Sequence, residues 1–265
     1  MTTIKVTPMI KFLYISLICM LPAGYGAYEL TKGSWPSEND TKILFIGNSL
    51  TQRNDLPSMV RKIAQSKEDA VYSKMYARGG AKLSHHSRSE KVKQLLDETD
   101  WDYVVLQEQS QLPALSDRYF AQKTLPFAAK LSDRAREVSP ETKVVFYMGM
   151  AHKNGDPLNK DAVPEVGRYD GMQRRINAAY RQMARQNRAS VVPVGETWAR
   201  MRAKHPEVEL YADDRHPSVA GTYLAACVFY TSLFSERCQG AYRPSSLNEE
   251  TALKIQQLSD DVLSP

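Results

Sequence analysis

Apolar residues in this chain alternate between short runs typical of strands and longer stretches with helical spacing. Five segments predict β-strands at residues 42–46, 71–77, 103–106, 143–148 and 191–194. Between and after them, apolar positions recur every three or four residues and predict helices at 56–66, 90–96, 119–137, 172–186, 218–234 and 249–263. Strands separated by helices in this way predict an α/β fold, with a parallel sheet covered by helices on both faces.

The composition is that of a globular protein. The chain has 265 residues, of which 42% are hydrophobic and 25% charged, and this excludes a disordered polymer, a collagen-like repeat and a bare coiled coil. Lysine and arginine total 35 against 30 acidic residues, a formal net charge of +5, and the basic residues are scattered. Because nucleic-acid binding needs a basic patch, we expect no nucleic-acid partner.

Residues 1–26 have the layout of a secretory signal peptide. Two lysines precede an apolar run at 12–20, and small residues follow it. A bilayer span takes about 20 residues, so this run is too short, and we expect no membrane span after cleavage. An uncleaved anchor or a buried strand is the alternative. The sequence then predicts a linker at 27–41 and one domain at 42–265, in a secreted or periplasmic protein.

Cleavage of the signal would remove Cys19 and leave Cys227 and Cys238. In an oxidising compartment these two could pair. Eleven residues of straight helix would, however, separate them by about 16 Å, which is too far for a disulfide. Unless the chain doubles back after Ser235, we expect Cys227 to be a core thiol.

Polar or glycine-rich segments follow three of the predicted strands and precede the predicted helix 218–234. In a parallel sheet such segments meet at the carboxyl ends of the strands, where ligands of these folds bind. The irregular segment 151–168 is too long for a plain connection, and its length is typical of loops that cover a site. The four polar segments are 47–51, 78–81, 107–110 and 213–217.

Ser49 lies on the tight turn between the first strand and the following helix. Such a turn exposes a hydroxyl group and directs free backbone N–H groups toward it, as in a nucleophile elbow. A serine at this place is also a common helix cap. The segment lacks both the G-x-G-x-x-G and the P-loop lysine patterns, so nucleotide binding is not indicated.

His216 is the histidine best placed to act as a base for Ser49. It stands where a loop enters a helix, and Asp213 can fold back onto its imidazole and stabilise the protonated form. A helix-capping loop with an incidental histidine is the alternative. His85 and His86 lie in a serine-rich stretch after the second strand and are predicted to be solvated loop residues.

A metal-dependent hydrolase is a further alternative. Its ligands would be Asp213, Asp214, His216, His85 and His86, but these lack helical ligand spacing, and no zinc-type cysteine spacing occurs. We therefore expect no metal ion and no cofactor.

The segments around Ser49 and His216 together resemble sequence blocks of the SGNH (GDSL-like) hydrolase superfamily. The first, ILFIGNSLT at 43–51, is similar to the first block of that superfamily, with Asn48 where many members have aspartate. The second, DDRHPS at 213–218, is similar to the last block, D-x-x-H. Both blocks occur in the expected order.

The two middle blocks resemble the superfamily less closely. Gly79 or Gly80 falls where the superfamily has its glycine block. The third block is usually G-x-N-D, whose asparagine helps to form the oxyanion hole, whereas this chain has QEQS at 107–110. The resemblance is thus to a divergent branch, in which a glutamine amide would stand in for the asparagine.

The resemblance implies a secreted serine ester hydrolase with a flavodoxin-like three-layer α/β/α fold and a five-stranded parallel sheet. Ser49 would attack the ester, His216 would take its proton, and Asp213 would orient His216. The N–H groups of Ser49 and of Gly79 or Gly80 would bind the oxyanion.

The third oxyanion donor is expected at the end of the third strand. Glu108 cannot serve, because a carboxylate would repel the oxyanion, which leaves the amides of Gln107 and Gln109. We predict Gln107, because it is nearest the strand end.

The substrate class follows only from the resemblance combined with export. An exported acyl hydrolase of this type most often meets acetylated glycans, so we expect a small-molecule or glycan ester substrate and a carbohydrate O-acetylesterase. A lipase or lysophospholipase shares this chemistry, and a non-catalytic carbohydrate-binding protein of the same fold is the rival from another class. The oligomeric state is left open.

Overall fold

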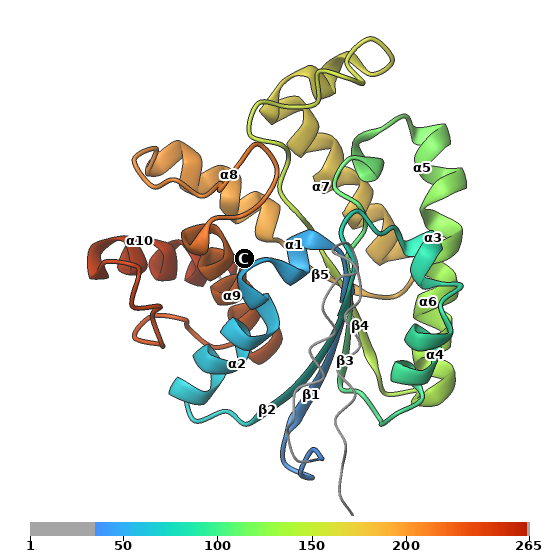
Figure 1. Cartoon of the computed structure of the whole chain (residues 1–265), viewed down its shortest axis with the longest axis vertical. Coiled ribbons are helices and arrows are strands. Elements are labelled where there is room, and N and C mark those ends of the chain that lie inside the picture. The colour runs from blue at the N-terminus through green and yellow to red at the C-terminus, as the bar shows by residue number, and fades with distance from the viewer. Residues whose placement is uncertain (1–34, 264–265) are drawn as a thin grey trace, which may run out of the picture.

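The computed structural model describes residues 35–263, and its main feature is a five-stranded parallel sheet with helices on both sides (Figure 1). The strands are β1 (Thr41–Gly47), β2 (Val71–Ala77), β3 (Tyr103–Leu106), β4 (Lys143–Tyr147) and β5 (Ser190–Val192). Their order in the sheet is β2-β1-β3-β4-β5, and each neighbouring pair is parallel. This is the flavodoxin-like order, in which ligands bind at the carboxyl ends of β1 and β3, where the winding direction switches.

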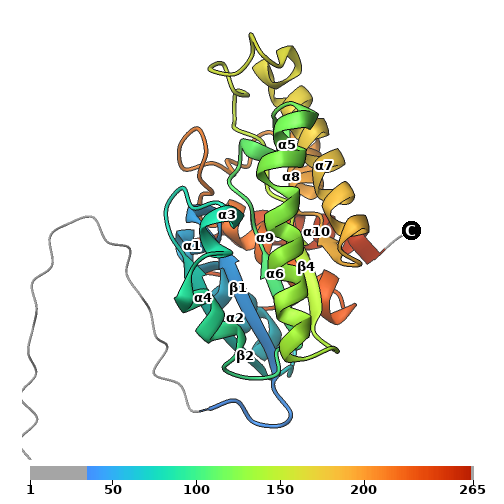
Figure 2. The same cartoon turned by 90° about the vertical axis from the view of Figure 1, so that its right-hand side faces the viewer.

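Helices form two outer layers (Figures 1 and 2). One layer contains α2 (Leu56–Ser66), α8 (Val194–Lys204), α9 (Val219–Phe234) and α10 (Glu249–Asp260). The other contains α4 (Glu90–Leu96), α5 (Asp117–Lys123), α6 (Leu125–Val138) and α7 (Tyr169–Gln186). Two short helices, α1 (Ser49–Gln52) and α3 (Leu83–His86), follow β1 and β2 at the edge of the sheet where the strands end. Single turns of 3-10 helix lie at Arg53–Asp55, Leu112–Ala114, Pro164–Gly167 and Asp261–Leu263.

Each face of the sheet has its own hydrophobic core. Successive residues of a strand point to opposite faces, so Ile43 and Phe45 pack beneath α2 and α9, whereas Leu44 and Ile46 pack beneath α4, α6 and α7. All four side chains are fully buried. Burial on both faces explains why the strands appear in the sequence as continuous apolar runs rather than as alternating patterns.

The structure confirms the predicted fold class and all five strands, whose ends differ from the predicted ones by at most two residues. The predicted helix 119–137 is instead two helices. They meet at Thr124, whose backbone leaves the helical region (φ −125°, ψ −55°), because Pro126 in the first turn of α6 cannot continue a helix. Helix α8 is absent from the sequence-based prediction, although Val194, Trp198 and Met201 recur at helical spacing.

A disulfide joins Cys227 and Cys238, because the chain does double back after Ser235, and Cys227 is therefore not a core thiol. Helix α9 ends at Phe234, and Ser235 adopts the left-handed conformation (φ 58°), which reverses the chain. The reversal brings the two Cα atoms to 5.4 Å, within disulfide reach.

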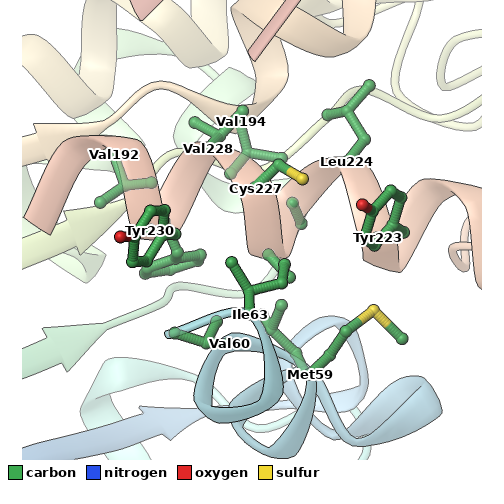
Figure 3. Close-up of a cluster of buried hydrophobic side chains, with 14 of the residues drawn as sticks. Met59, Val60, Ile63, Val192, Val194, Tyr223, Leu224, Cys227, Val228 and Tyr230 are labelled. Atoms are coloured by element: carbon green, nitrogen blue, oxygen red, sulfur yellow. The ribbon is translucent and has the colours of Figure 1, made fainter. Parts of the chain in front are cut away.

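Cys227 lies in the apolar layer between α2 and α9. Figure 3 shows it on α9 near Leu224 and Val228, in the same cluster as Val60 and Ile63 of α2. Both cysteines are fully buried, so the crosslink ties the α9 core to the segment that leads to α10.

The predicted signal peptide at 1–26 and most of the predicted linker lie outside the described residues. Within residues 35–263, no helix has both the length and the apolar character needed to cross a membrane.

Candidate active site

Ser49 is the first residue of α1, directly after the turn that closes β1. Asn48 caps this helix, because its Oδ1 accepts a hydrogen bond from the Leu50 N–H at 3.1 Å. The N–H of a first helical residue has no partner one turn earlier in its own helix. Gly47 allows the tight turn, since a Cβ atom there would lie 2.7 Å from Oε1 of Gln107 and closer still to Thr51.

His216 contacts Ser49 and Asp213 at the same time. Its Nε2 lies 3.0 Å from the Ser49 Oγ, and its Nδ1 lies 2.8 Å from Oδ2 of Asp213. The structure therefore brings together three residues that are up to 167 positions apart in the sequence. The side chains of His216 and Asp213 are 32% and 48% exposed, and Ser49 is half-buried.

The carboxylate of Asp213 is held in place by its own loop. Its Oδ1 accepts hydrogen bonds at 2.8 Å from the backbone N–H groups of Arg215 and His216. These bonds, led by the one from Arg215 and joined by the His216 ring, hold the pKa of Asp213 well below its usual range. The carboxylate is therefore ionised at neutral pH and can accept the Nδ1–H of the imidazole.

Asp214 has a different role from its neighbour. Its Oδ1 accepts a hydrogen bond from Nδ2 of Asn154 at 2.8 Å, and its backbone oxygen accepts one from the Lys153 N–H at 2.8 Å. Nearby, the Tyr211 hydroxyl donates to the Ala151 oxygen at 2.6 Å. The base of the segment 151–168 thus braces the loop that carries His216, and the rest of the segment extends beyond the sheet (yellow in Figure 1).

The segment with Gly79 and Gly80 lies beside the Ser49 turn. Ala77 is the parallel partner of Gly47, and Nδ2 of Asn48 donates to the Ala81 oxygen at 3.0 Å. Within the described part of the chain, the N–H groups of Gly79 and Gly80 make no hydrogen bond. Gly80 has φ +67°, a conformation that favours glycine. This segment therefore has free N–H groups beside the turn that carries Ser49.

Gln107 is not placed where it could bind an oxyanion, which corrects the predicted role of its amide. The side chain is fully buried. Its Oε1 accepts hydrogen bonds from the Asn48 N–H at 2.9 Å and the Thr51 hydroxyl at 3.0 Å, and its Nε2 donates to the Glu108 oxygen. Gln107 instead holds the turn that presents Ser49.

Gln109, the other amide considered, is also used within its own loop. Its Nε2 donates to Oε1 of Gln111 at 3.0 Å, and its Oε1 accepts from the Gln111 N–H at 3.0 Å. At the end of β3 both glutamine side chains thus bond within the protein, whereas the free backbone N–H groups of Gly79 and Gly80 follow β2.

Glu108 is a buried carboxyl group behind the site. Its Oε1 accepts hydrogen bonds from the Gln109 N–H at 2.7 Å and the Leu83 N–H at 3.1 Å. Burial raises its pKa to about 7, against the lowering effect of those bonds. Glu108 therefore links the loop after β3 to the start of α3.

Two buried histidines have structural positions that the sequence pattern did not indicate. His86, predicted to be a solvated loop residue, is only 2% exposed, and its Nε2–H donates to the Gly47 oxygen at 2.8 Å. Burial lowers the pKa of His86 to about 4. His152 is 3% exposed, lies 3.1 Å from the Ser110 hydroxyl through Nε2, and has a pKa that burial lowers. Neither burial follows from the local sequence, because polar and charged residues follow both histidines.

The five residues considered as metal ligands do not form one cluster. His86 bonds to Gly47, whereas Asp213 and His216 bond to each other. Among residues 35–263, no group of three or more His, Cys, Asp or Glu side chains is arranged to hold a metal ion.

Comparison with known proteins gives matches among solved structures only. No family model and no curated protein matches the sequence. A structure from Slackia heliotrinireducens assigned to the SGNH hydrolases is 31% identical, with a TM-score of 0.59, over 74% of this chain and 100% of that one. A DUF4886 family protein from Bacteroides uniformis has a TM-score of 0.71 at 18% identity, over 85% and 96% of the two chains. The acetyl xylan esterase AlAXEase has a TM-score of 0.54 at 18% identity, over 72% and 99%.

Proposed function

Because this chain belongs to the SGNH hydrolase family, we propose that it is a serine ester hydrolase with Ser49, His216 and Asp213 as its catalytic residues. The observation that carries the proposal is the continuous contact from the Ser49 Oγ to His216 Nε2 at 3.0 Å and from His216 Nδ1 to Asp213 at 2.8 Å. A nucleophile, its base and the group that orients the base are thus in hydrogen-bond contact.

The proposed reaction has two halves. In the first, the Ser49 oxygen attacks the ester carbonyl carbon while His216 Nε2 takes its proton, and Asp213 stabilises the imidazolium. The carbon–oxygen bond to the alcohol then breaks, and the alcohol oxygen takes the proton from Nε2. In the second half, water gives a proton to Nε2 and attacks the acyl-serine, which releases the acid and returns the proton to Ser49.

Negative charge on the carbonyl oxygen needs donors near Ser49. We assign this role to the backbone N–H groups of Ser49 and of Gly79 or Gly80. The absence of hydrogen bonds from the two glycine N–H groups within the described residues supports this assignment. One such donor is typically worth about 2.7–4 kcal/mol of transition-state stabilisation.

We further propose that the substrate is an O-acetylated carbohydrate and that the protein is exported. The catalytic side chains are solvent-accessible, which suits an ester on a bulky glycan, and the same fold is found in an acetyl xylan esterase. The Cys227–Cys238 disulfide supports an oxidising compartment. The proposed signal peptide at 1–26 would direct the protein to export.

An acyl-chain series from 4-nitrophenyl acetate to palmitate tests this function. We expect the highest kcat/KM with acetate, and losses of roughly 10⁴-fold or more in kcat for Ser49→Ala and for His216→Ala. The double variant should be little slower than either single variant, because the residues act as one unit. Ser139→Ala, in a serine at the end of α6 and away from the site, is the matched control.

Three results would overturn parts of this proposal. Ser49→Ala retaining more than about a tenth of the wild-type rate would remove the nucleophile assignment. A preference for palmitate would indicate a lipase. Binding of glycans without any turnover would indicate the non-catalytic carbohydrate-binding protein.

A further inference from the structure

A pocket of about 510 Å³ opens beside the Ser49 turn. This volume lies within the roughly 300–1,000 Å³ of small-molecule sites. The residues that line it and matter here are Tyr76, Arg78, Gly79, Gly80, His85 and Arg88. None of them belongs to the proposed catalytic residues, but Gly79 and Gly80 are shared with the proposed oxyanion hole.

The pocket is joined to the Ser49 turn by direct bonds. The Arg78 N–H donates to the Gly47 oxygen at 3.4 Å, and the same oxygen accepts from His86 at 2.8 Å. Asn48, the neighbour of Ser49, donates to the Ala81 oxygen. The segments that line the pocket are therefore bonded to the turn that carries Ser49.

The pocket has positive charge and no carboxylate. Arg78 and Arg88 are exposed, and the lining contains no Asp or Glu. Within the described part of the chain neither arginine makes an ion pair, whereas Arg134, Arg175 and Arg181 each contact a carboxylate. Two arginines with unused donors in one concave pocket are suited to an anion.

Two further contacts fix donor groups at the pocket. The Arg88 guanidinium lies over the Phe127 ring, 5.5 Å from its centroid, which restricts the side chain. The Lys82 N–H donates to Nδ1 of His85 at 3.3 Å, so in the neutral ring the proton is on Nε2. His85 thus offers a donor at the edge of the pocket even when it is uncharged.

We propose that this pocket binds an anionic oxygen group of the substrate, so that the enzyme acts on acetyl esters of acidic sugars. The inference rests on the proposed esterase function. The planar fork of arginine matches the paired oxygens of a carboxylate or a sulfate. On an acetylated sugar these are a uronic acid and a sulfate ester. Binding of this group places the neighbouring acetyl ester at Ser49.

Three O-acetylated methyl glycosides that differ only at C6 test the proposal. They carry a glucuronate, the corresponding uncharged uronamide, and a 6-sulfate, and the measured quantity is kcat/KM. We expect the wild type to favour the glucuronate over the uronamide by about tenfold or more, because charged hydrogen bonds exceed neutral ones. Comparing glucuronate with sulfate identifies which oxygen group the pocket prefers.

Variants of the two arginines test whether the preference for the charged substrate arises in this pocket. Arg78→Gln and Arg88→Gln should each reduce the ratio of charged to uncharged substrate, mainly through a higher KM for the charged one, and the double variant should bring the ratio close to one. Arg185→Gln, an exposed arginine at the end of α7 and on the far side of the sheet from β2, controls for the loss of net charge and should keep the preference.

The outcomes separate this inference from the proposed function. Ser49-dependent hydrolysis of 4-nitrophenyl acetate with equal kcat/KM for glucuronate and uronamide would overturn the anion pocket and leave the esterase standing. If no ester is hydrolysed, the anion pocket can still be tested by calorimetric titration of unacetylated methyl glucuronoside into the wild type and into Arg78→Gln. Binding that Arg78→Gln does not weaken, or no binding, would overturn the pocket.

Discussion

The side-chain oxygen of Gln107 accepts a hydrogen bond from the backbone N–H of Asn48 at 2.9 Å. This bond joins the end of β3 to the turn after β1, at the place where a flavodoxin-like sheet reverses its winding. The same oxygen accepts from Thr51 in α1. The residue predicted to touch the substrate therefore holds the backbone that presents Ser49.

Gln107→Ala should destabilise the fold. The substitution leaves two buried donors, the Asn48 N–H and the Thr51 hydroxyl, without an acceptor, and each such group costs about 1–3 kcal/mol. For a domain of this size we expect the melting temperature to fall by roughly 5–12 °C. Gln186→Ala, in an exposed glutamine at the end of α7, should melt like the wild type. An unchanged melting temperature with turnover reduced by roughly 10²–10³ would restore the oxyanion role.

The two adjacent aspartates should differ sharply in their effect on turnover. Asp213→Asn removes the charge that stabilises the His216 imidazolium, and we expect kcat to fall by roughly 10³–10⁴. Asp214→Asn is the matched control, because an amide oxygen can still accept the hydrogen bond from Asn154. Steady-state kinetics of both variants and the wild type with one acetyl ester measure this difference in kcat. Equal losses in both variants would show that the charge of the loop as a whole, and not Asp213, matters.

The Cys227–Cys238 disulfide should contribute measurably to stability. Joining residues 11 positions apart restricts the unfolded chain, and such crosslinks typically contribute roughly 2–4 kcal/mol. We expect the double variant Cys227→Ala and Cys238→Ala to melt lower by roughly 5–12 °C. In parallel, thiol titration of denatured protein cleaved after Gly26 should find no free thiol, whereas a pair of core thiols would react fully.

The buried Glu108 should make stability depend on pH. Its pKa in the folded protein is raised to about 7 by burial, above its usual value, so the folded state keeps a proton that the unfolded chain releases. The stabilising contribution is therefore complete below about pH 4.5 and is lost as the pH rises through about 7.

Glu108→Gln removes this titration and keeps an oxygen for the Leu83 and Gln109 N–H groups. Between pH 5 and pH 8 the wild type should lose on the order of 2–3 kcal/mol relative to this variant, measured by urea unfolding at each pH. Glu90→Gln, which changes an exposed glutamate, should show the same pH dependence of the unfolding free energy as the wild type. Parallel curves for wild type and Glu108→Gln would mean that Glu108 is ionised at neutral pH.

The local sequence alone determined the strands and most of the helices. Runs such as Ile43–Ile46 are apolar at every position because both faces of the sheet are covered, and that pattern is visible without coordinates. The same holds for the turn that carries Ser49, because parallel strands all end at one edge of the sheet. His216 follows no strand, and its contact with Ser49 was expected from the resemblance to the SGNH sequence blocks. Secondary structure and its periodicity are short-range properties.

Tertiary structure alone decided which polar residues face solvent and which support the site. Gln107, Glu108 and His86 all look like loop residues in the sequence, yet each is buried, because segments far away in the chain close over them. The reversal at Ser235 likewise brings Cys238 back to Cys227, against the distance that a straight helix predicts. Burial and pairing depend on contacts between residues distant in the sequence, and no local pattern encodes those contacts.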